Sequence, residues 1–309
     1  VGCVWGRFSL FLNCPSCAVS HDVFKWSILS SPGKEMAFDW IGETATGRNS
    51  DYLSINAFAF RQFFEAEFSM TLDIDTWSGV RLALKYPFVI NHAPEIGECK
   101  INPANGTAFF TKFVVRCINF KDKNIPLTYK MIASDLHGFA KISSLKENTL
   151  GSVLYMGKAL SSPPSFLPAG VLANSYSIKI YVQVYDSLGA FSQVTLYATV
   201  HAPTDKSSSK NVLDQLLNLT TGPNSVIPPL LQKQDFLSAG YLTYVVASVL
   251  NGIKSKSILK ADKARLREYL INQTLVFPMG NLMEISQLVM AVATLTQEPS
   301  EIPHMPLQH

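Results

Sequence analysis

Residues 66–74 read AEFSMTLDI, and this stretch decides the fold class. Every second residue is apolar, and the residues between them are polar or charged. The apolar positions are Ala66, Phe68, Met70, Leu72 and Ile74, and the polar positions are Glu67, Ser69, Thr71 and Asp73. Successive side chains of a β-strand point to opposite faces, so the alternation is typical of a sheet with one face buried and one in water.

Strand-like segments on both sides of this stretch make a first series. They are the alternating residues Phe8, Leu10, Leu12 and Cys14, then FKWSIL at 24–29, YLSI at 52–55 and, after the central stretch, VRLALKYPFVIN at 80–91. We expect Trp26 to pack in the core, as a tryptophan on the third strand of a sandwich often does. Proline interrupts strand pairing, so we place the end of the first domain, residues 1–92, at His92-Ala93-Pro94.

A second series repeats this plan over residues 93–202. It comprises TKFVVRCINF at 111–120, PLTYKMIA at 126–133, YSIKIYVQVYDSLGA at 176–190 and FSQVTLYATV at 191–200. We expect Ile178, Ile180, Val182 and Val184 to face the core, and Lys179 and Gln183 to face solvent. Two series of roughly 100 residues each predict two tandem all-β sandwiches of the fibronectin type III or immunoglobulin kind.

The apolar period changes after a linker, HAPTDKSSSK at 201–210, so residues 203–309 are expected to form an all-α helical bundle. Four helices are predicted from four apolar stripes. The stripes are Val212, Leu213, Leu216 and Leu217; Phe236, Ala239, Leu242, Val246, Val249, Leu250 and Ile253; Leu266, Tyr269 and Leu270; and Leu282, Ile285, Leu288, Val289, Val292 and Leu295. Asn281, with Glu284 three residues on, is the predicted N-cap of the last helix.

The composition excludes several classes of protein. The 309 residues are 47% hydrophobic and 16% charged with a net charge of +3, which suits packed cores and not a disordered chain. No run of Lys and Arg occurs, so nucleic acid is not an expected partner. The apolar stretch at 241–250 is shorter than the roughly 20 residues of a membrane helix. No initiator Met or signal peptide is present, and we expect a segment of a larger protein.

Cysteines and N-glycosylation sequons together indicate an extracellular or lumenal address. The cysteines are Cys3, Cys14, Cys17, Cys99 and Cys117, and the sequons begin at Asn105, Asn218 and Asn272. Disulfides persist in oxidising compartments, and N-glycans mark secreted surfaces. The odd number of cysteines suggests that one partner lies upstream of Val1.

Cys99 and Cys117 are the predicted disulfide. One follows the domain boundary and the other ends a strong strand, so neighbouring strands would bring the two thiols within bonding range. A reactive thiol pair is not supported, because no basic residue or helix N-terminus is implied beside either cysteine. The bridge is not the one between the second and sixth strands of immunoglobulin domains, because YSIKIYVQV carries no cysteine.

Cys14-Pro-Ser-Cys17 allows three interpretations. Either cysteine can be bridged to Cys3 or to a residue upstream, the two can form a redox pair, or they can bind zinc together with His21 and Cys3. Glycosylation favours the first, because thiols oxidise in the secretory pathway. We therefore predict no metal site and no cofactor.

Motifs of catalysis are absent from the sequence. The six histidines are scattered, and neither H-E-x-x-H nor G-x-S-x-G occurs. Residues 151–159, GSVLYMGKA, are one residue too long for a phosphate-binding loop and end on Ala where a magnesium ligand is needed. We expect no catalytic residues and no enzyme activity. A secreted enzyme with β-sandwich accessory domains is the less favoured reading.

Several stretches resemble the receptor for egg jelly (REJ) module of the polycystin-1 family, and within it the sperm member. They are FSLFLNCPSC at 8–17, FKWSIL at 24–29, FDWIGETATGRNSDYLSI at 38–55, VINHAPEIGECKINP at 89–103, PLTYKMIASDLHG at 126–138 and VYDSLGAFSQVTL at 184–196. LREYLINQTLVF at 266–277 is similar to the family's region that leads toward its autoproteolytic GAIN-type domain. The family's cleavage dipeptide, His-Leu before Ser or Thr, is absent.

The resemblance implies an ectodomain segment of a multi-pass membrane protein, on the extracellular side of the sperm plasma or acrosomal membrane. It implies a part in fertilization and the acrosome reaction through a calcium-permeable ion channel. This segment is expected to act in recognition or as a stalk. Expected partners are an extracellular glycoprotein or glycan and, for the parent, a polycystin-2-like channel subunit. The membrane is reached through parts outside this segment. The alternative is an ectodomain spacer of another polycystin-1-like mechanosensory or chemosensory cation channel.

Overall fold

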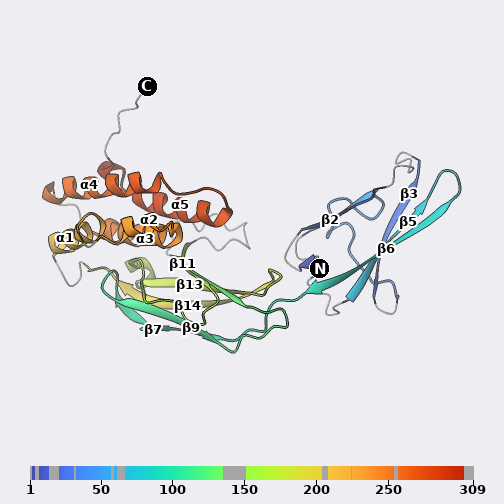
Figure 1. The fold of residues 1–309 in the computed structure, drawn as a ribbon, viewed down its shortest axis with the longest axis horizontal. Coiled ribbons are helices and arrows are strands. Elements are labelled where there is room, and N and C mark those ends of the chain that lie inside the picture. The colour runs from blue at the N-terminus through green and yellow to red at the C-terminus, as the bar shows by residue number, and fades with distance from the viewer. Residues whose placement is uncertain are drawn as a thin grey trace, which may run out of the picture. The chain divides into compact units, whose positions relative to one another are not determined.

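A computed structural model describes the chain in ten ranges and places strands first and helices last (Figure 1). The ranges are residues 2–3, 7–13, 21–30, 33–56, 59–60, 67–134, 151–203, 208–223, 225–253 and 257–302. The chain forms two compact units. Unit 1 comprises residues 1–94 with the short segments 122–125 and 185–191, and unit 2 comprises the rest, helices included.

Unit 1 is built from two sheets. Its strands are β1 (Gly2–Cys3), β2 (Phe8–Phe11), β3 (Val23–Ser30), β4 (Tyr52–Ile55), β5 (Glu67–Asp75) and β6 (Arg81–Asn91). One sheet has the order β1-β6-β5-β3, and the other pairs β2 with β4. The β1–β6 pair is parallel, while β3, β5 and β6 pair antiparallel with continuous register.

The alternation that predicts β5 is confirmed from Glu67 onward, and Ala66 lies outside the described residues. Phe68, Met70, Leu72 and Ile74 are buried and belong to one cluster with Leu53 and Ile55 of the other sheet, so the two sheets share a core. Trp26 is also in this core, as expected. Its indole nitrogen Nε1 donates to the carbonyl of Ser50 at 2.7 Å, which satisfies the polar end of the ring.

The strands of unit 2 also form two sheets. They are β7 (Glu98–Asn102), β8 (Asn105–Thr107), β9 (Lys112–Ile118), β10 (Thr128–Ser134), β11 (Ser152–Gly157), β12 (Ser165–Phe166), β13 (Ser177–Tyr185) and β14 (Phe191–His201). The orders are β11-β10-β13-β14-β8 and β12-β9-β7. The sequence prediction of β-rich regions followed by a helical end is confirmed.

Strand β13 follows its predicted pattern at all but one position. Ile178, Ile180, Val182 and Val184 are fully buried. Gln183, which we expected to face solvent, is only 3% exposed. Its Nε2 donates to Oε1 of Gln193 on β14 at 3.0 Å. The prediction was wrong because strand periodicity gives the face of a sheet but not whether that face is covered, and a buried amide is tolerated when it is hydrogen-bonded.

Five helices follow in the described part of the chain. They are α1 (Ser209–Thr220), α2 (Ile227–Gln232), α3 (Phe236–Gly252), α4 (Ser257–Thr274) and α5 (Leu282–Leu295). Two single-turn 3₁₀ segments occupy Leu172–Asn174 and Pro299–Glu301. In the ranges that the structure covers, no helix has the length and apolarity needed to cross a bilayer.

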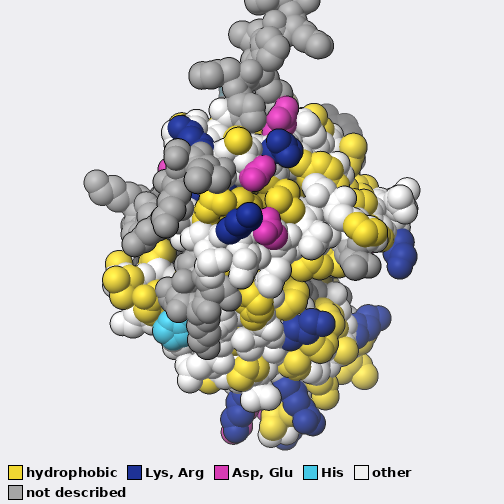
Figure 2. All heavy atoms as spheres, turned by 90° about the vertical axis from the view of Figure 1, so that its left-hand side faces the viewer, with side chains coloured by type: hydrophobic (Ala, Val, Ile, Leu, Met, Phe, Trp, Pro, Cys, Tyr) yellow, Lys and Arg dark blue, Asp and Glu magenta, His cyan; other side chains and the backbone are white. Residues whose placement is uncertain are grey.

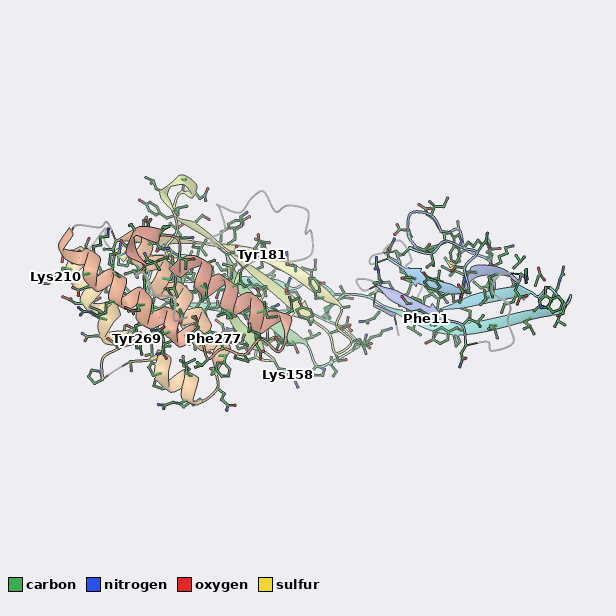
Figure 3. The ribbon with its side chains drawn as sticks, turned by 90° about the horizontal axis from the view of Figure 1, so that it is seen from above. Phe11, Lys158, Tyr181, Lys210, Tyr269 and Phe277 are labelled. Carbon is green, nitrogen blue, oxygen red and sulfur yellow. A yellow bond between two sulfur atoms is a disulfide. The ribbon has the colours of Figure 1, made fainter. Side chains whose placement is uncertain are left out.

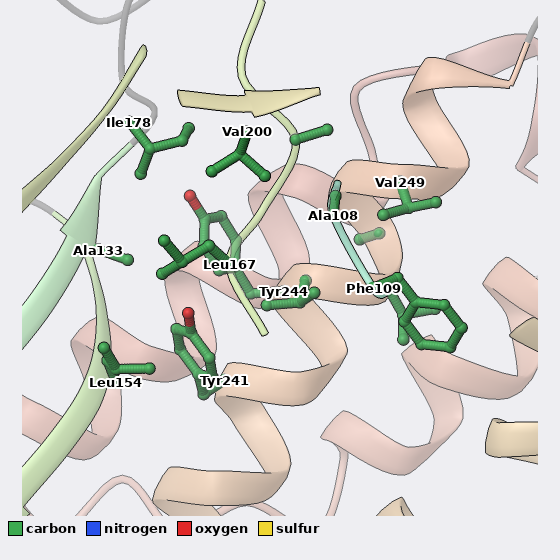
Figure 4. Close-up of a cluster of buried hydrophobic side chains, with 14 of the residues drawn as sticks. Ala108, Phe109, Ala133, Leu154, Leu167, Ile178, Val200, Tyr241, Tyr244 and Val249 are labelled. Atoms are coloured by element: carbon green, nitrogen blue, oxygen red, sulfur yellow. The ribbon is translucent and has the colours of Figure 1, made fainter. Parts of the chain in front are cut away.

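The helices and the sheets of unit 2 share one core. Figure 4 shows Tyr241, Tyr244 and Val249 of α3 beside side chains that come from strands and loops, such as Ile178 and Val200. The hydroxyl of Tyr241 donates to the carbonyl of Phe166 at 2.7 Å, and the amide of Ala169 donates to Oγ of Ser248 at 3.1 Å. Helix α3 is therefore fixed to the sheet layer by hydrogen bonds as well as by apolar packing.

Two predictions about the helices need correction. Helix α2 was missed because its sequence, IPPLLQ, carries two prolines, which a helix accepts only in its first turn. The predicted inner stripe of α5 was wrong in part, because Leu295 is buried and Leu288 packs against the core but other members do not. Leu282 is 73% exposed, and Ile285 and Val289 are also exposed, while Gln287 and Met290 are buried.

The buried face of α5 includes a polar residue that sequence periodicity does not recognise. Gln287 accepts from the amide of Val153 at 2.7 Å and donates to Oγ of Ser152 at 2.9 Å and to the carbonyl of Leu237 at 3.2 Å. These bonds offset the cost of burying the amide and set the rotation of the helix. The predicted N-cap is confirmed, because Oδ1 of Asn281 accepts from the amide of Glu284 at 2.9 Å.

Three charged side chains are buried together between α4 and the last 3₁₀ turn. Glu301 binds Nζ of Lys263 at 2.5 Å and Nη2 of Arg267 at 2.9 Å, and all three side chains are almost fully buried. Arg267 also donates to the carbonyl of Leu295 at 2.8 Å and to Oδ1 of Asn251 at 2.7 Å. Moving α4 or the 3₁₀ turn away would leave a buried charge without its partner, which is very costly. The cluster therefore holds these two elements together.

Candidate ligand-binding groove

A polar groove of about 340 Å³ lies on the outward face of the larger sheet of unit 1. Strand β3 contributes Lys25, Ser27 and Leu29, strand β5 contributes Thr71 and Asp73, and strand β6 contributes Ala83, Leu84 and Lys85. Glu35, from the segment between β3 and β4, completes the lining. This face is opposite the one that β5 buries in the core, so the groove is made from the polar half of the same alternation that predicts the strand.

Strand register brings the groove residues into two rows. Lys25 is opposite Asp73, and Asp73 is opposite Ala83. In the next row Ser27 is opposite Thr71, and Thr71 is opposite Lys85. The methyl group of Ala83 is the smallest side chain in these rows. The larger side chains of Asp73 and Lys85 stand beside it. The hollow therefore forms where the sheet carries least side-chain volume.

One wall of the groove is anchored by Arg48. Its guanidinium is paired with the carboxylate of Glu35 and donates to Oγ of Ser27 at 3.0 Å and to the carbonyl of Trp26 at 2.8 Å. The same guanidinium lies over the ring of Trp40, 5.7 Å from its centroid. Arg48 thus joins the loop that bears Glu35 to β3, and the acidic edge of the groove is held against the sheet.

The groove offers two ammonium groups, two carboxylates and two hydroxyls around a small apolar floor. Such a set suits a polar ligand with both donors and acceptors, and it has no strong bias toward either charge. The lining residues include no aromatic ring, so they provide no stacking platform. In the described ranges no three His, Cys, Asp or Glu side chains are grouped to hold a metal ion. Sequence reasoning missed this groove because no motif marks it.

Cys99 and Cys117 are joined by a disulfide in unit 2, with an S–S distance of 2.03 Å. They stand directly opposite each other on the antiparallel strands β7 and β9, and both are buried. The bridge thus ties the first strand of unit 2 to its neighbour. Cys14 and Cys17 lie outside the described residues, as does the side chain of Cys3, so the alternatives for the C-x-x-C motif stay open.

The three sequons share one arrangement, in which the asparagine is exposed and the threonine is buried. Asn105 begins β8, Asn218 lies in α1 and Asn272 lies near the end of α4. Oγ1 of Thr220 donates to the carbonyl of Leu216 at 2.8 Å, and Oγ1 of Thr274 donates to that of Ile271 at 2.7 Å. Each asparagine has room for a glycan, and Asn→Gln removes a sequon without disturbing a buried hydroxyl. Occupancy of the three sites stays a prediction.

The surface of unit 2 is mixed in character. Figure 2 shows hydrophobic, polar and charged side chains intermingled on the face that it presents. Lys158, Lys210 and Tyr269 are among the residues of this unit that Figure 3 labels. Burial lowers the pKa of Lys130 on β10 and raises the pKa of Tyr269 on α4. Neither residue belongs to a cluster that suggests chemistry.

Comparison with known proteins gives a family match and strong relatives, among them a human and a mouse protein. The family model described as "REJ domain" matches residues 5–245. The human polycystin family receptor for egg jelly is 62% identical over 295 residues, which are 96% of this chain and 13% of that protein. The mouse protein of the same name is 55% identical over 302 residues, which are 98% of this chain and 14% of that protein.

Similarity to solved structures is distant. The crystal structure of murine CEACAM1b covers 64% of this chain and 94% of that chain at 10% identity, with a TM-score of 0.24. The family match, in contrast, extends over well more than half of the chain and includes both series of strands. This chain therefore belongs to the REJ domain family.

Proposed function

We propose that this chain is an ectodomain segment of a polycystin-family membrane receptor and acts by recognition or as a stalk, not by catalysis. The observation that carries the proposal is the REJ match over residues 5–245 together with 62% and 55% identity to two proteins named as receptors for egg jelly. The chain spans only 13% and 14% of the length of those relatives, so a role of the whole protein is inferred and not observed.

The extracellular address has independent support in the chain itself. A disulfide joins Cys99 to Cys117, and the asparagines of all three sequons are exposed. Both features suit a protein made through the secretory pathway. We further propose that the parent protein is on the sperm plasma or acrosomal membrane and works in fertilization and the acrosome reaction. The calcium-permeable channel would lie outside this segment. Any polycystin-2-like subunit would bind parts of the parent protein outside this segment.

The architecture suits a receptor built from repeated modules. In both units a short strand, β1 or β8, pairs parallel with the last long strand, β6 or β14, and a second, smaller sheet closes the core. This order supports the proposal that residues 1–92 and 93–202 are tandem sandwiches of the fibronectin type III or immunoglobulin kind. Residues 203–309 would be the third sequence module, although the helices share a core with the second.

We assign recognition to the groove of unit 1. The ligand class that fits its ammonium, carboxylate and hydroxyl groups is an extracellular glycoprotein or glycan, whose amide and hydroxyl groups both donate and accept. Lys25 and Lys85 stand on opposite sides of the central strand β5, so they would contact the ligand at two points.

Binding of egg-coat glycoprotein to the chain, made by a secretory host, tests the proposal. The double variant Lys25→Ala/Lys85→Ala should weaken binding by roughly tenfold or more, equivalent to the loss of about 1.4 kcal/mol. Lys158→Ala, an exposed lysine of unit 2, is the matched control and should bind as the unchanged chain does. Enzymatic removal of N-glycans distinguishes contacts made by the protein from contacts made by its own sugars.

Equal binding by both variants would remove the groove from the proposal. Absence of any binding to egg-coat material would favour a spacer, which the fused core and buried ion cluster of unit 2 also suit. A spacer would still require oxidised Cys99 and Cys117 and secretion. Free thiols in a chain isolated from its native membrane would contradict the extracellular address itself.

A further inference from the structure

The two units begin their strand series in the same way. In unit 2, β8 pairs parallel with the end of β14, where Asn105 is opposite Thr199. In unit 1, β1 pairs parallel with the end of β6, where Gly2 is opposite Ile90. Residues 4–7 then separate β1 from β2, and residues 108–111 separate β8 from β9, four in each case. Strands β1 and β2 therefore correspond to β8 and β9.

Unit 2 has one strand before this pair that unit 1 lacks in the described chain. Two residues separate the end of β7 from the start of β8, and β7 pairs antiparallel with β9 from Glu98↔Ile118 to Asn102↔Val114. Because β12 pairs with the other side of β9, that strand has a neighbour on both edges. Strand β2 pairs with β4 alone among the described strands. The counterpart of β7 would stand immediately before Gly2.

Hydrogen bonds around β4 show which backbone groups of β2 face its open edge. The carbonyl of Ser54 accepts from the amide of Ala45 at 2.8 Å, and the amide of Ser54 donates to Oγ1 of Thr46 at 3.1 Å. Both groups of Ser54 thus point away from β2. In an antiparallel pair, opposite residues point their backbone groups the same way relative to the ladder, both inward or both outward. Ser9, opposite Ser54, therefore directs its N–H and C=O away from β4.

Side-chain contacts agree with this assignment of backbone directions. Opposite residues that do not exchange backbone bonds have closer side chains, and Oγ of Ser9 lies 3.1 Å from Oγ of Ser54. Two residues further, the ring of Phe11 stacks on that of Tyr52 at 5.8 Å between centroids. Phe11 has the same backbone direction as Ser9, and its side chain is 78% exposed (Figure 3). The edge of β2 that has no partner among the described strands thus carries two outward N–H and C=O pairs beside an exposed ring.

We propose that the residues preceding Val1 in the full-length protein form an extended strand that pairs antiparallel with β2 along this edge. An unpaired edge is a template for another strand, and a short connection into β1 makes the preceding residues the partner at highest local concentration. The relatives that share the family are about seven times longer than this chain, which leaves ample polypeptide outside it. The completed sheet would have three strands, like β12-β9-β7.

Amide hydrogen exchange resolved to single residues tests this pairing. Two proteins are compared, the chain starting at Val1 and the full-length ectodomain. The amides of Ser9 and Phe11 should exchange at least about tenfold more slowly in the ectodomain, because they gain backbone acceptors. Amides of β9 are the internal control and should exchange equally in both, because β7 already covers that strand.

Equal exchange of Ser9 and Phe11 in the two proteins would overturn the proposal. Slower exchange that depends on protein concentration would also overturn it, because a second copy of the chain would then cover the edge. A synthetic peptide of the fifteen or so residues that precede Val1, added to the shorter chain, should restore the protection, and the same peptide in scrambled order should not. This outcome does not depend on which ligand the receptor recognises.

Discussion

The two units differ in what covers their sheets. In unit 2 the helices pack on the strands and complete a single core, so that side chains from β13, β14 and α3 meet (Figure 4). In unit 1 the core comes from strands and the loops around them, and most of β6 is exposed. A face that is covered by helices contributes to rigidity, and a face that is left bare is available for contact. This difference fits our proposal that unit 2 gives support and unit 1 gives recognition.

Charged residues show the same difference. Unit 2 buries Lys263 and Arg267 with Glu301, while the pair of Arg81 and Asp75 in unit 1 lies on the surface, with Nε of Arg81 3.0 Å from Oδ1 of Asp75. Water screens the second pair and cannot reach the first. The buried cluster therefore makes the fold of unit 2 depend on a single arrangement of α4 and the 3₁₀ turn Pro299–Glu301.

The largest expected effect is that of Arg267→Ala. Removal of this side chain takes away buried hydrogen bonds to the carbonyl of Leu295 and to Glu301, and should lower the free energy of unfolding of unit 2 by about 3–5 kcal/mol. Urea unfolding followed through signals of unit 2 measures it. Arg81→Ala is the matched control and should change stability by less than about 1 kcal/mol. Similar losses for both would erase the contrast between the units.

A smaller effect is expected from Leu72→Ala in unit 1. Leu72 is 1% exposed, and its partner across the β5–β6 ladder, Leu84, is 48% exposed. Truncation of Leu72 should cost about 2–5 kcal/mol, because it leaves a cavity, and truncation of Leu84 should cost about 0.5 kcal/mol or less. Thermal melts of the two variants compare them directly. A large loss for Leu84→Ala would mean that β6 is covered in the folded protein.

The third prediction concerns the disulfide of unit 2. The bridged cysteines are separated by 18 residues in sequence, and Cys117→Ala removes the bridge. In the chain-entropy view this loss should lower the free energy of unfolding by about 3 kcal/mol. Secretion should fall as well. The double variant Cys99→Ala/Cys117→Ala separates loss of the bridge from damage done by a lone thiol. An unchanged melting temperature in the double variant would show that the bridge does not stabilise unit 2.

The sequence predicted elements well where one periodicity decided the outcome. The alternation at 66–74 identified β5, and the spacing of Asn281 and Glu284 identified the start of α5. Helix α2 was missed because its two prolines are allowed only by their position, which depends on where the helix begins. The buried face of α5 was misplaced because Gln287, with three hydrogen bonds, replaces an apolar residue there.

The candidate groove could not be read from the sequence for a similar reason. In the sequence, Lys25, Asp73 and Lys85 look like the solvent-facing residues of ordinary strands. Only the pairing register of the strands places them beside Ala83. The Cys99–Cys117 pair was easier to propose, because sequence separation is short and two adjacent strands suffice. Long-range register, and not residue type, is what separates these two cases.

The proposal that unit 1 binds the ligand and unit 2 supports it is tested most directly by a hydrogen-exchange footprint. The footprint compares the chain with and without egg-coat glycoprotein. We predict slower exchange in peptides of β3, β5 and β6 around Lys25, Asp73 and Lys85, with the exchange of the helices and sheets of unit 2 unchanged. A footprint that falls on α3, α5 or β13 while these three strands exchange as before would contradict it.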